Sequence, residues 1–121
     1  MKGLGALESQ VMAVLWDSAE ALSVHDLVER LSSDERVPAY TTVLTVVTHL
    51  FEKEWVRREK VGRSYRYLPS RSRAEATTDL LREILDDSPD APAVLLHLAR
   101  TASVREVEAL RRGISGDERR E

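Results

Sequence analysis

A change of hydrophobic period between Pro38 and Pro69 constrains the fold more than any other feature of the sequence. In the first half of this stretch the apolar residues recur at helical spacing, about 100° per residue, and collect on one side. They are Val43, Val46, Val47, Leu50 and Phe51. In the second half, Val56–Lys60 and Tyr65–Leu68 have the β-branched and aromatic content of two short strands, joined through residues 61–64. The sequence therefore predicts a helix followed directly by a β-hairpin.

The face of this helix opposite the apolar stripe is rich in threonine. Thr41, Thr42, Thr45 and Thr48 fall within eight residues, where a purely solvated face would favour Glu, Lys and Arg. Threonine is a mediocre helix former, because its hydroxyl competes for backbone hydrogen bonds. Breaks of local propensity are frequent where a surface has a function. We therefore expect this face to bind a partner.

The hairpin region carries a concentrated positive charge. Between Lys53 and Arg73 there are eight Lys or Arg and two Glu, whereas residues 74–121 carry 7 basic and 11 acidic side chains. The net charge of −3 therefore conceals a basic patch, and a patch is what attracts phosphate. A helix beside a basic hairpin is typical of a winged helix, in which the helix enters a major groove and the hairpin lies along the phosphates.

The predicted DNA-binding residues come from both elements: Tyr40, Thr41, Thr42, Thr45, His49, Lys53, Arg63 and Arg66. Thr45 and His49 suit base edges, since a threonine offers a hydroxyl and a methyl that can contact the thymine methyl. Thr41 and Thr42, at the helix start, are expected to hold a phosphate with the N-terminal amides. Tyr40 is either a phosphate contact or a core ring. Side chains alternate along a strand, so about half of the hairpin cations face away from DNA, and Arg63 at the turn is the strongest candidate.

The segment before this stretch completes a first predicted domain. Leu4–Trp16 is expected to form an amphipathic helix with Leu7, Val11, Val14 and Leu15 on its inward face. Ala21-Leu22 is expected to form a short strand that pairs with the hairpin. Ser23 opens a second helix with a capping box, and that helix ends near Ser32. Residues 1–72 are therefore predicted to form a winged-helix DNA-binding domain, in a mostly α chain with a small β-hairpin.

Residues 73–121 are predicted to form a helical dimerisation region. Capping boxes at Ser72 and Ser103 and a break at Ser88-Pro89 delimit three short helices, and the charged end, residues 115–121, is expected to fray. A segment of about 45 residues rarely makes a sufficient core alone. A second copy of the chain is the simplest partner. The apolar residues expected at that contact are Leu80, Leu81, Ile84, Leu85, Leu95, Leu98, Val107 and Leu110.

Several classes of protein are excluded by what the sequence lacks. Gly-x-Ser-x-Gly and HExxH motifs and phosphate-cradling glycine loops are all missing, so we predict that the chain is not an enzyme. His25, His49 and His97 are far apart and there is no cysteine, so neither a metal site nor a cofactor is expected. There is no signal-peptide pattern and no apolar run near the ~18 residues of a membrane span, which favours a cytoplasmic protein.

Four segments together carry a specific signature. They are L-G-A-L-E-S-Q-V-M-A-V-L-W (4–16), A-Y-T-T-V-L-T-V-V-T-H-L-F-E-K-E-W-V (39–56), G-R-S-Y-R-Y-L-P (62–69) and, more loosely, A-V-L-L-H-L-A-R (93–100). In these segments the chain resembles the penicillinase repressor family of bacterial winged-helix transcriptional repressors. The resemblance implies a homodimer on a palindromic operator upstream of β-lactam-resistance or cell-wall-stress genes.

The same resemblance implies how repression is relieved. In the family, a membrane sensor peptidase responds to β-lactam and the repressor is cut in its C-terminal helices. The positions that match the cleavage site are His97-Leu98, where the staphylococcal members have Asn-Phe. The resemblance thus adds a possible cleavage site and a possible peptidase partner to the DNA and the second copy.

Two alternative functions stay open at this point. A winged helix can use its third helix to dock a protein, which would require an apolar groove with a polar rim in place of the basic hairpin. A repressor can also be gated by a small molecule bound between its domains, although the short C-terminal region leaves little room for one.

Overall fold

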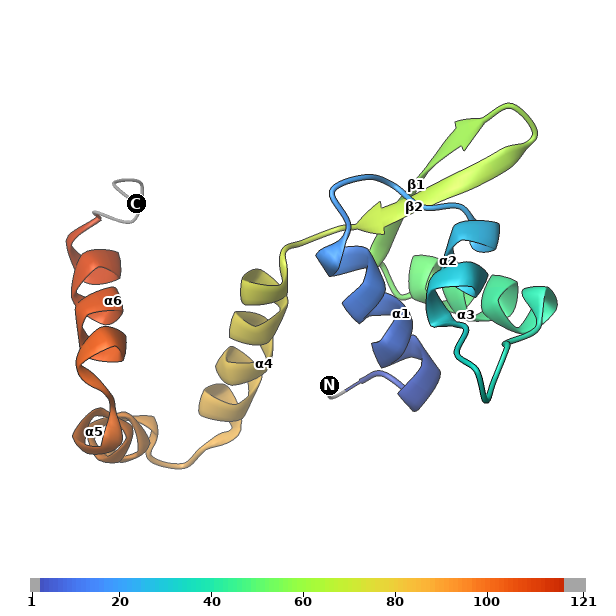
Figure 1. Ribbon diagram of the computed structural model, residues 1–121. Helices are drawn as coiled ribbons and strands as arrows, with labels where there is room; N and C mark the ends of the chain where they lie inside the picture. Colours follow the sequence, from blue (N-terminus) through green and yellow to red (C-terminus); the bar gives the residue numbers. More distant parts are fainter. Residues whose placement is uncertain (1–2, 117–121) are drawn as a thin grey trace. The chain divides into compact units, whose positions relative to one another are not determined.

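The computed structural model describes residues 3–116, which contain six helices and one two-stranded antiparallel sheet (Figure 1). The helices are α1 (Ala6–Asp17), α2 (Val24–Leu31), α3 (Tyr40–Glu52), α4 (Arg73–Asp87), α5 (Ala91–Thr101) and α6 (Val104–Ser115), and the strands are β1 (Val56–Val61) and β2 (Ser64–Pro69). This order confirms the predicted mostly α fold with a small β-hairpin. Residues 117–121 of the charged end, expected to fray, lie outside the described residues.

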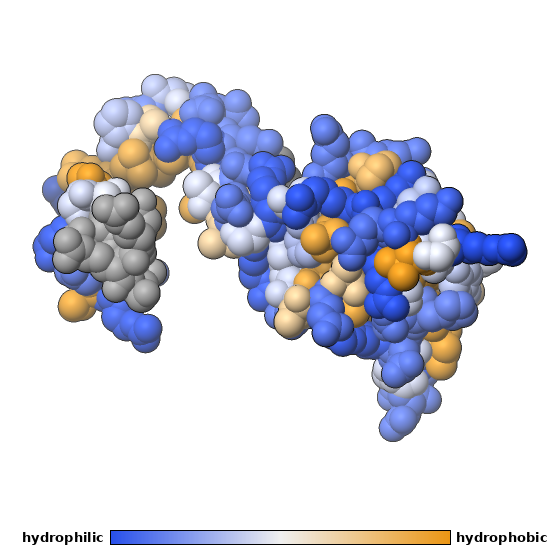
Figure 2. Space-filling model, turned by 90° about the horizontal axis from the view of Figure 1, so that it is seen from above, coloured by the Kyte–Doolittle hydropathy of each residue, from blue (hydrophilic) through white to orange (hydrophobic). Residues whose placement is uncertain are grey.

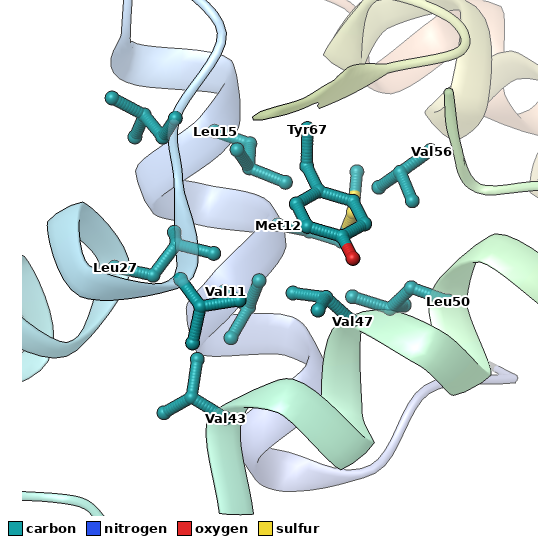
Figure 3. Packing of buried hydrophobic residues seen from close by; sticks show 11 residues of the cluster. Val11, Met12, Leu15, Leu27, Val43, Val47, Leu50, Val56 and Tyr67 are labelled. Carbon is teal, nitrogen blue, oxygen red and sulfur yellow. The ribbon is translucent and has the colours of Figure 1, made fainter. Parts of the chain in front are cut away.

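Two compact units divide the chain, Met1–Leu80 and Leu81–Glu121. The core of the first unit lies where α1, α2, α3 and the hairpin meet (Figure 3). The side chains labelled there are Val11, Met12 and Leu15 of α1, Leu27 of α2, Val43, Val47 and Leu50 of α3, Val56 of β1 and Tyr67 of β2. The predicted stripe of α3 is confirmed, because Val43, Val47 and Leu50 are 0% exposed and Val46 and Phe51 pack partly buried against the cluster.

The buried face of α1 is rotated from the predicted one. Leu7 and Val14, expected to point inward, are only half-buried, whereas Met12 is fully buried. Val11, Met12 and Leu15 share an arc of about 100° on the helix. Residues of α2, α3 and the hairpin pack against this arc, so the buried face of α1 is centred nearer Met12 than predicted.

The hairpin is tighter than predicted. β1 and β2 stay in register from Val56 opposite Pro69 to Val61 opposite Ser64, which leaves Gly62 and Arg63 alone in the turn. Gly62 has a φ of 65°, a left-handed backbone that glycine adopts without strain. Leu22 forms an isolated bridge with Tyr67, through N–H···O bonds of 2.9 and 2.8 Å, and this confirms the predicted short pairing segment.

The predicted capping boxes are present at three helix starts. The pairs are Ser23 with Asp26, Ser72 with Glu75 and Ser103 with Glu106. In each pair the backbone N–H of the acidic residue donates to the serine hydroxyl at 3.1 Å, and the serine N–H donates back to the carboxylate at 2.8 to 3.0 Å. These bonds satisfy backbone donors that a helix start otherwise leaves unpaired.

The beginning of α4 packs on the first unit. The Trp16 indole N–H donates to the carbonyl of Arg71 at 2.9 Å, the Arg73 guanidinium lies 5.3 Å from the Trp16 ring, and Ala76 is 4% exposed. The compact unit therefore continues to Leu80, past the predicted domain boundary after residue 72. That boundary stays a prediction about which part folds alone.

The second unit has no core within its described residues. From residue 81 to residue 116 no side chain is buried, although α5 carries Val94, Leu95, Leu96 and Leu98. Figure 2 shows such hydrophobic side chains in orange at the surface of the C-terminal helices. Within residues 3–116, no helix is both long and apolar enough to cross a bilayer.

Candidate nucleic-acid interface

The outward face of α3 holds most of the predicted contact residues of that helix. Thr41, Thr45 and His49 are exposed and lie on the side opposite the buried stripe. Thr42 is exposed too, but it lines a shallow hollow with Leu7 and other residues of α1 and the loop before α3. The helix therefore brings three of these residues together on one surface and turns Thr42 toward α1.

The threonine hydroxyls of α3 have a defined direction. Thr45 Oγ1 donates to the carbonyl of Thr41 at 2.9 Å, and Thr48 Oγ1 donates to the carbonyl of Leu44 at 2.8 Å. With the proton used inside the helix, such a hydroxyl offers lone pairs and a methyl outward. Amino groups of adenine and cytosine are donors in the major groove, and thymine presents a methyl, whereas a phosphate presents only acceptors. The geometry of Thr45 thus suits base edges better than phosphates.

The start of α3 is different. Its N-cap residue, Ala39, has no side chain that could accept a bond, so the first amides of the helix, from Tyr40 on, have no side-chain cap. Unpaired amides at a helix start attract anions. The Tyr40 ring, 41% exposed, lies 4.7 Å from the ring of His25, so it is a surface residue and not part of the core.

Tyr40 also lines a hollow of about 210 Å³ between α2, α3 and the tip of the hairpin. His25, Arg63 and Tyr65 line it too. Arg63, the predicted contact at the turn, therefore faces the beginning of α3. Within residues 3–116 it has no ion pair or hydrogen bond, so its charge is available to a partner.

Two other predicted contacts are already occupied within the protein. The Lys53 ammonium lies 3.0 Å from the Glu8 carboxylate, and the Arg66 guanidinium lies 3.8 Å from that of Asp26. The N–H of Gly5 and the Lys53 ammonium lower the pKa of Glu8, and the N–H of Ser23 lowers the pKa of Asp26, with Arg66 adding to that effect. To contact DNA, each of these cations would have to bind a phosphate in addition to its carboxylate, or leave the carboxylate.

The hairpin register decides which cations share a face. Cross-strand partners point to the same side, so Arg58 goes with the buried Tyr67, and Lys60 with Tyr65. Arg57, one residue from Arg58, points to the opposite side. Arg58 was not among the predicted contacts, yet its guanidinium lies on the side of the hairpin that holds the core. The sequence indicated this side, because Arg58 follows the apolar Val56 by two residues and alternate residues of a strand share a face.

The predicted dimerisation and cleavage residues lie in the C-terminal helices. Leu81, Ile84, Leu95, Leu98 and Leu110 are 47 to 57% exposed, Val107 is 37% exposed, and Leu80 and Leu85 are half-buried. His97 and Leu98 are exposed within the continuous helix α5. Among residues 3–116, no three His, Asp or Glu side chains gather as a metal site would require.

Comparison with known proteins identifies the family. A family model described as penicillinase repressor matches residues 4–116. The chain belongs to the penicillinase repressor family. It is 36% identical over 115 residues to the transcriptional regulator BlaI of Mycobacterium tuberculosis, in two strains, and the match covers 93% of this chain and 83% of each relative. A crystal structure of a MarR/EmrR family transcriptional regulator from Acinetobacter sp. ADP1 matches 95% of this chain and 79% of that one, with 16% identity and a TM-score of 0.45.

Membership of the penicillinase repressor family settles the class of function. The chain is a transcriptional repressor of the winged-helix type. The family and these relatives are regulators, which confirms the prediction that the chain is not an enzyme. The protein-interaction alternative loses its support, since DNA binding is the role for which such repressors use a winged helix.

Proposed function

We propose that this repressor binds a palindromic DNA operator as a homodimer, with α3 in the major groove and the hairpin along the phosphates. One observation carries the proposal: the exposed threonine face of α3 lies beside a hairpin in which Lys60 and Arg63, near its tip, have no ion pair among the described residues. Free cations gain most from releasing the counterions of DNA. The hairpin then contacts phosphates, and the bases are contacted by α3.

The homodimer is inferred from the second unit. Its apolar side chains, such as Leu98 and Leu110, stay exposed in the single chain. Burial of apolar area yields about 25 cal/mol per Å², so a second copy that covers these faces is strongly favoured. A two-fold dimer also matches the symmetry of a palindromic operator. We assign residues 1–72 to DNA binding and residues 73–121 to this contact.

Substitutions in α3 and at the hairpin turn test the assignment of bases and phosphates. Thr45→Ala and His49→Ala should each weaken operator binding by roughly 1 to 3 kcal/mol and leave random DNA nearly unaffected, because base contacts carry specificity. Arg63→Ala should weaken both DNAs alike and lower the slope of log K against log salt by about one per half-site. Fluorescence anisotropy with an operator found by genomic footprinting measures all three.

Thr42→Ala is the matched control, since Thr42 is also an exposed α3 threonine but faces α1. It should not change which sequence is preferred. Equal losses on operator and random DNA for Thr45→Ala would remove Thr45 from the base contacts. A wild-type protein that prefers no DNA sequence at any salt concentration would overturn the proposed function itself.

The regulated genes and the release are part of the proposal. The family description, penicillinase repressor, supports control of β-lactam-resistance genes. We propose that the protein acts on these or on cell-wall-stress genes, in the bacterial cytoplasm. Release follows when a membrane sensor peptidase cuts the His97-Leu98 bond. Since that bond lies inside α5, the helix has to open locally first, and Pro92 and the N-cap at Asp90 mark where it starts.

A further inference from the structure

The Arg58 guanidinium lies over two aromatic rings. Its guanidinium carbon lies 3.9 Å from the centre of the Phe51 ring and 4.2 Å from the centre of the Tyr65 ring. Phe51 belongs to the last turn of α3, Arg58 to β1 and Tyr65 to β2. The contact therefore connects the end of the recognition helix to both strands of the hairpin. A guanidinium stacks on aromatic faces through its own flat faces.

This arrangement lies at the corner between α3 and the hairpin. Around the helix, Phe51 lies between the buried Val47 and the outward Thr48, on the side next to the hairpin. Tyr65 also lines the hollow that contains Tyr40 and Arg63. When a helix occupies a major groove and a hairpin lies along the backbone, a strand of phosphates has to pass this corner.

The stacking leaves the edge of the guanidinium free. Arginine has five N–H donors in the plane of the group, and neither aromatic ring offers the carboxylate or carbonyl oxygen that would accept them. Within residues 3–116 no carboxylate or carbonyl accepts a hydrogen bond from Arg58, and its side chain is exposed. Arg66 differs, because Asp26 lies 3.8 Å from its guanidinium.

We propose that Arg58 is a pre-oriented contact to one DNA backbone phosphate in each half-site, aimed by Phe51 and Tyr65. The proposal rests on the proposed DNA-binding function and adds a residue to it. A phosphate fits better than a base, since a guanidinium fixed at the corner cannot extend to the floor of the groove, while its planar donors match two phosphate oxygens. The rings hold the side chain in place before binding, so less rotamer freedom is lost on contact.

The test asks whether the contribution of Arg58 to affinity depends on one particular phosphate. Operator duplexes in which one phosphate at a time is a neutral methylphosphonate are titrated with wild type and with Arg58→Gln, which keeps a planar side chain and removes the charge. In the wild type one position in each half-site should cost about tenfold to a hundredfold in affinity. With Arg58→Gln that position should cost almost nothing, and the salt slope should fall by about one per half-site.

Arg57→Gln is the matched control, because Arg57 is the adjacent exposed arginine on the opposite side of the strand. It should leave the methylphosphonate profile unchanged. Tyr65→Leu keeps the charge but removes one ring, and it should weaken the same position partly. Thermal melts exclude a general loss of fold, which would not select one phosphate.

The outcomes separate this inference from the proposed function. A wild type that binds operator with a steep salt slope, but shows the same phosphate profile as Arg58→Gln, would overturn the role of Arg58 and leave the repressor function intact. A purely structural role predicts a lower melting temperature with an unchanged profile, which would also overturn it. Absence of any sequence-preferring DNA binding by the wild type would instead contradict the proposed function.

Discussion

The two units of this repressor both contain capped helices with apolar faces, but they differ in how far those faces are buried. The first unit gathers eleven buried side chains into one core, ten of them from five elements and one, Leu22, from the segment between α1 and α2. Six of the nine labelled in Figure 3 come from α1 and α3. The second has no buried side chain between residues 81 and 116, although α5 is among the most apolar segments of the chain. Apolar content alone therefore does not predict burial within one chain.

The ion pairs differ in the same way. In the first unit Lys53 reaches Glu8 across 45 positions of sequence, whereas the described ion pairs of the second unit, Arg82 with Asp86 and Arg111 with Glu108, join neighbours on one helix. Capping boxes are as good at Ser103 as at Ser23. Local sequence thus specifies the helices of both units, and the first unit adds a buried core and long-range contacts such as that of Lys53 with Glu8.

The largest expected effect comes from severing the second unit. An engineered protease site at residues 88–90, between α4 and α5, should leave the first unit with a cooperative melt while operator affinity falls. Two linked half-site contacts hold roughly 10² to 10⁴ times more tightly than separate ones, and cutting removes that advantage. Anisotropy before and after complete cutting measures the loss.

A duplex with one half-site is the control for this cut. Its affinity should be the same before and after cleavage, because a single DNA-binding unit gains nothing from the link. Unchanged affinity for the full operator in the fully cut protein would show that release does not work by uncoupling. A cut protein that also loses its cooperative melt would show that the first unit depends on α5 and α6.

A pair of leucines tests the comparison in both directions. Leu50 is 0% exposed in the first unit, so Leu50→Ala should lower the free energy of unfolding of that unit by about 2 to 5 kcal/mol and leave the dimer constant unchanged. Leu98 is 55% exposed, so Leu98→Ala should leave that unfolding free energy unchanged. It should weaken the dimer by roughly tenfold to a hundredfold, because a buried leucine contributes about 1.5 to 3 kcal/mol. Urea melts and sedimentation equilibrium measure the two quantities.

Leu96→Ala is the matched control on the same helix. Leu96 is 58% exposed, yet at about 100° per residue it lies on the other side of α5 from Leu98. It should affect neither measurement. If Leu96→Ala weakens the dimer as much as Leu98→Ala, the predicted contact face of α5 is wrong.

The parts that the sequence predicted well are those that short-range chemistry decides. The α3 stripe follows from helical spacing, the helix starts from Ser-x-x-acid patterns, and the pairing at Leu22 from a short apolar segment before a turn. Met12 was missed because the angle at which α1 packs is set by other elements. The spacing of Arg58 from Val56 placed it on the core side of the strand, but its contact with Phe51 and Tyr65 is set by the fold and was not predicted.

Ion pairs across the fold were also beyond the sequence. Lys53 and Arg66 were expected to contact DNA from their place in a basic stretch, and their carboxylate partners come from α1 and α2. A charge count along the chain does not reveal such partners, because Glu8 and Asp26 lie far from the hairpin in sequence. Their contact with DNA stays a prediction.

The smallest expected effect is the pH dependence of the first unit's stability. Glu8 accepts bonds from the Gly5 N–H at 2.8 Å and from Lys53 at 3.0 Å, and these hold its pKa below the ordinary value of 4.5. A carboxyl with a lowered pKa in the fold stabilises the fold above its unfolded pKa, and the contribution disappears as the pH falls through the folded pKa. Glu8→Gln should therefore destabilise the unit by about 0.2 to 1 kcal/mol at pH 7, with the difference from wild type shrinking below pH 4.5. Glu52→Gln is the matched control, because Glu52 is an exposed carboxyl of α3 with no ion pair among the described residues, and it should change the stability at pH 7 by less than about 0.5 kcal/mol. Urea melts from pH 3 to pH 7 supply the comparison, and a constant gap between Glu8→Gln and wild type over that range would show that the tie between α1 and the end of α3 does not depend on the charge of Glu8.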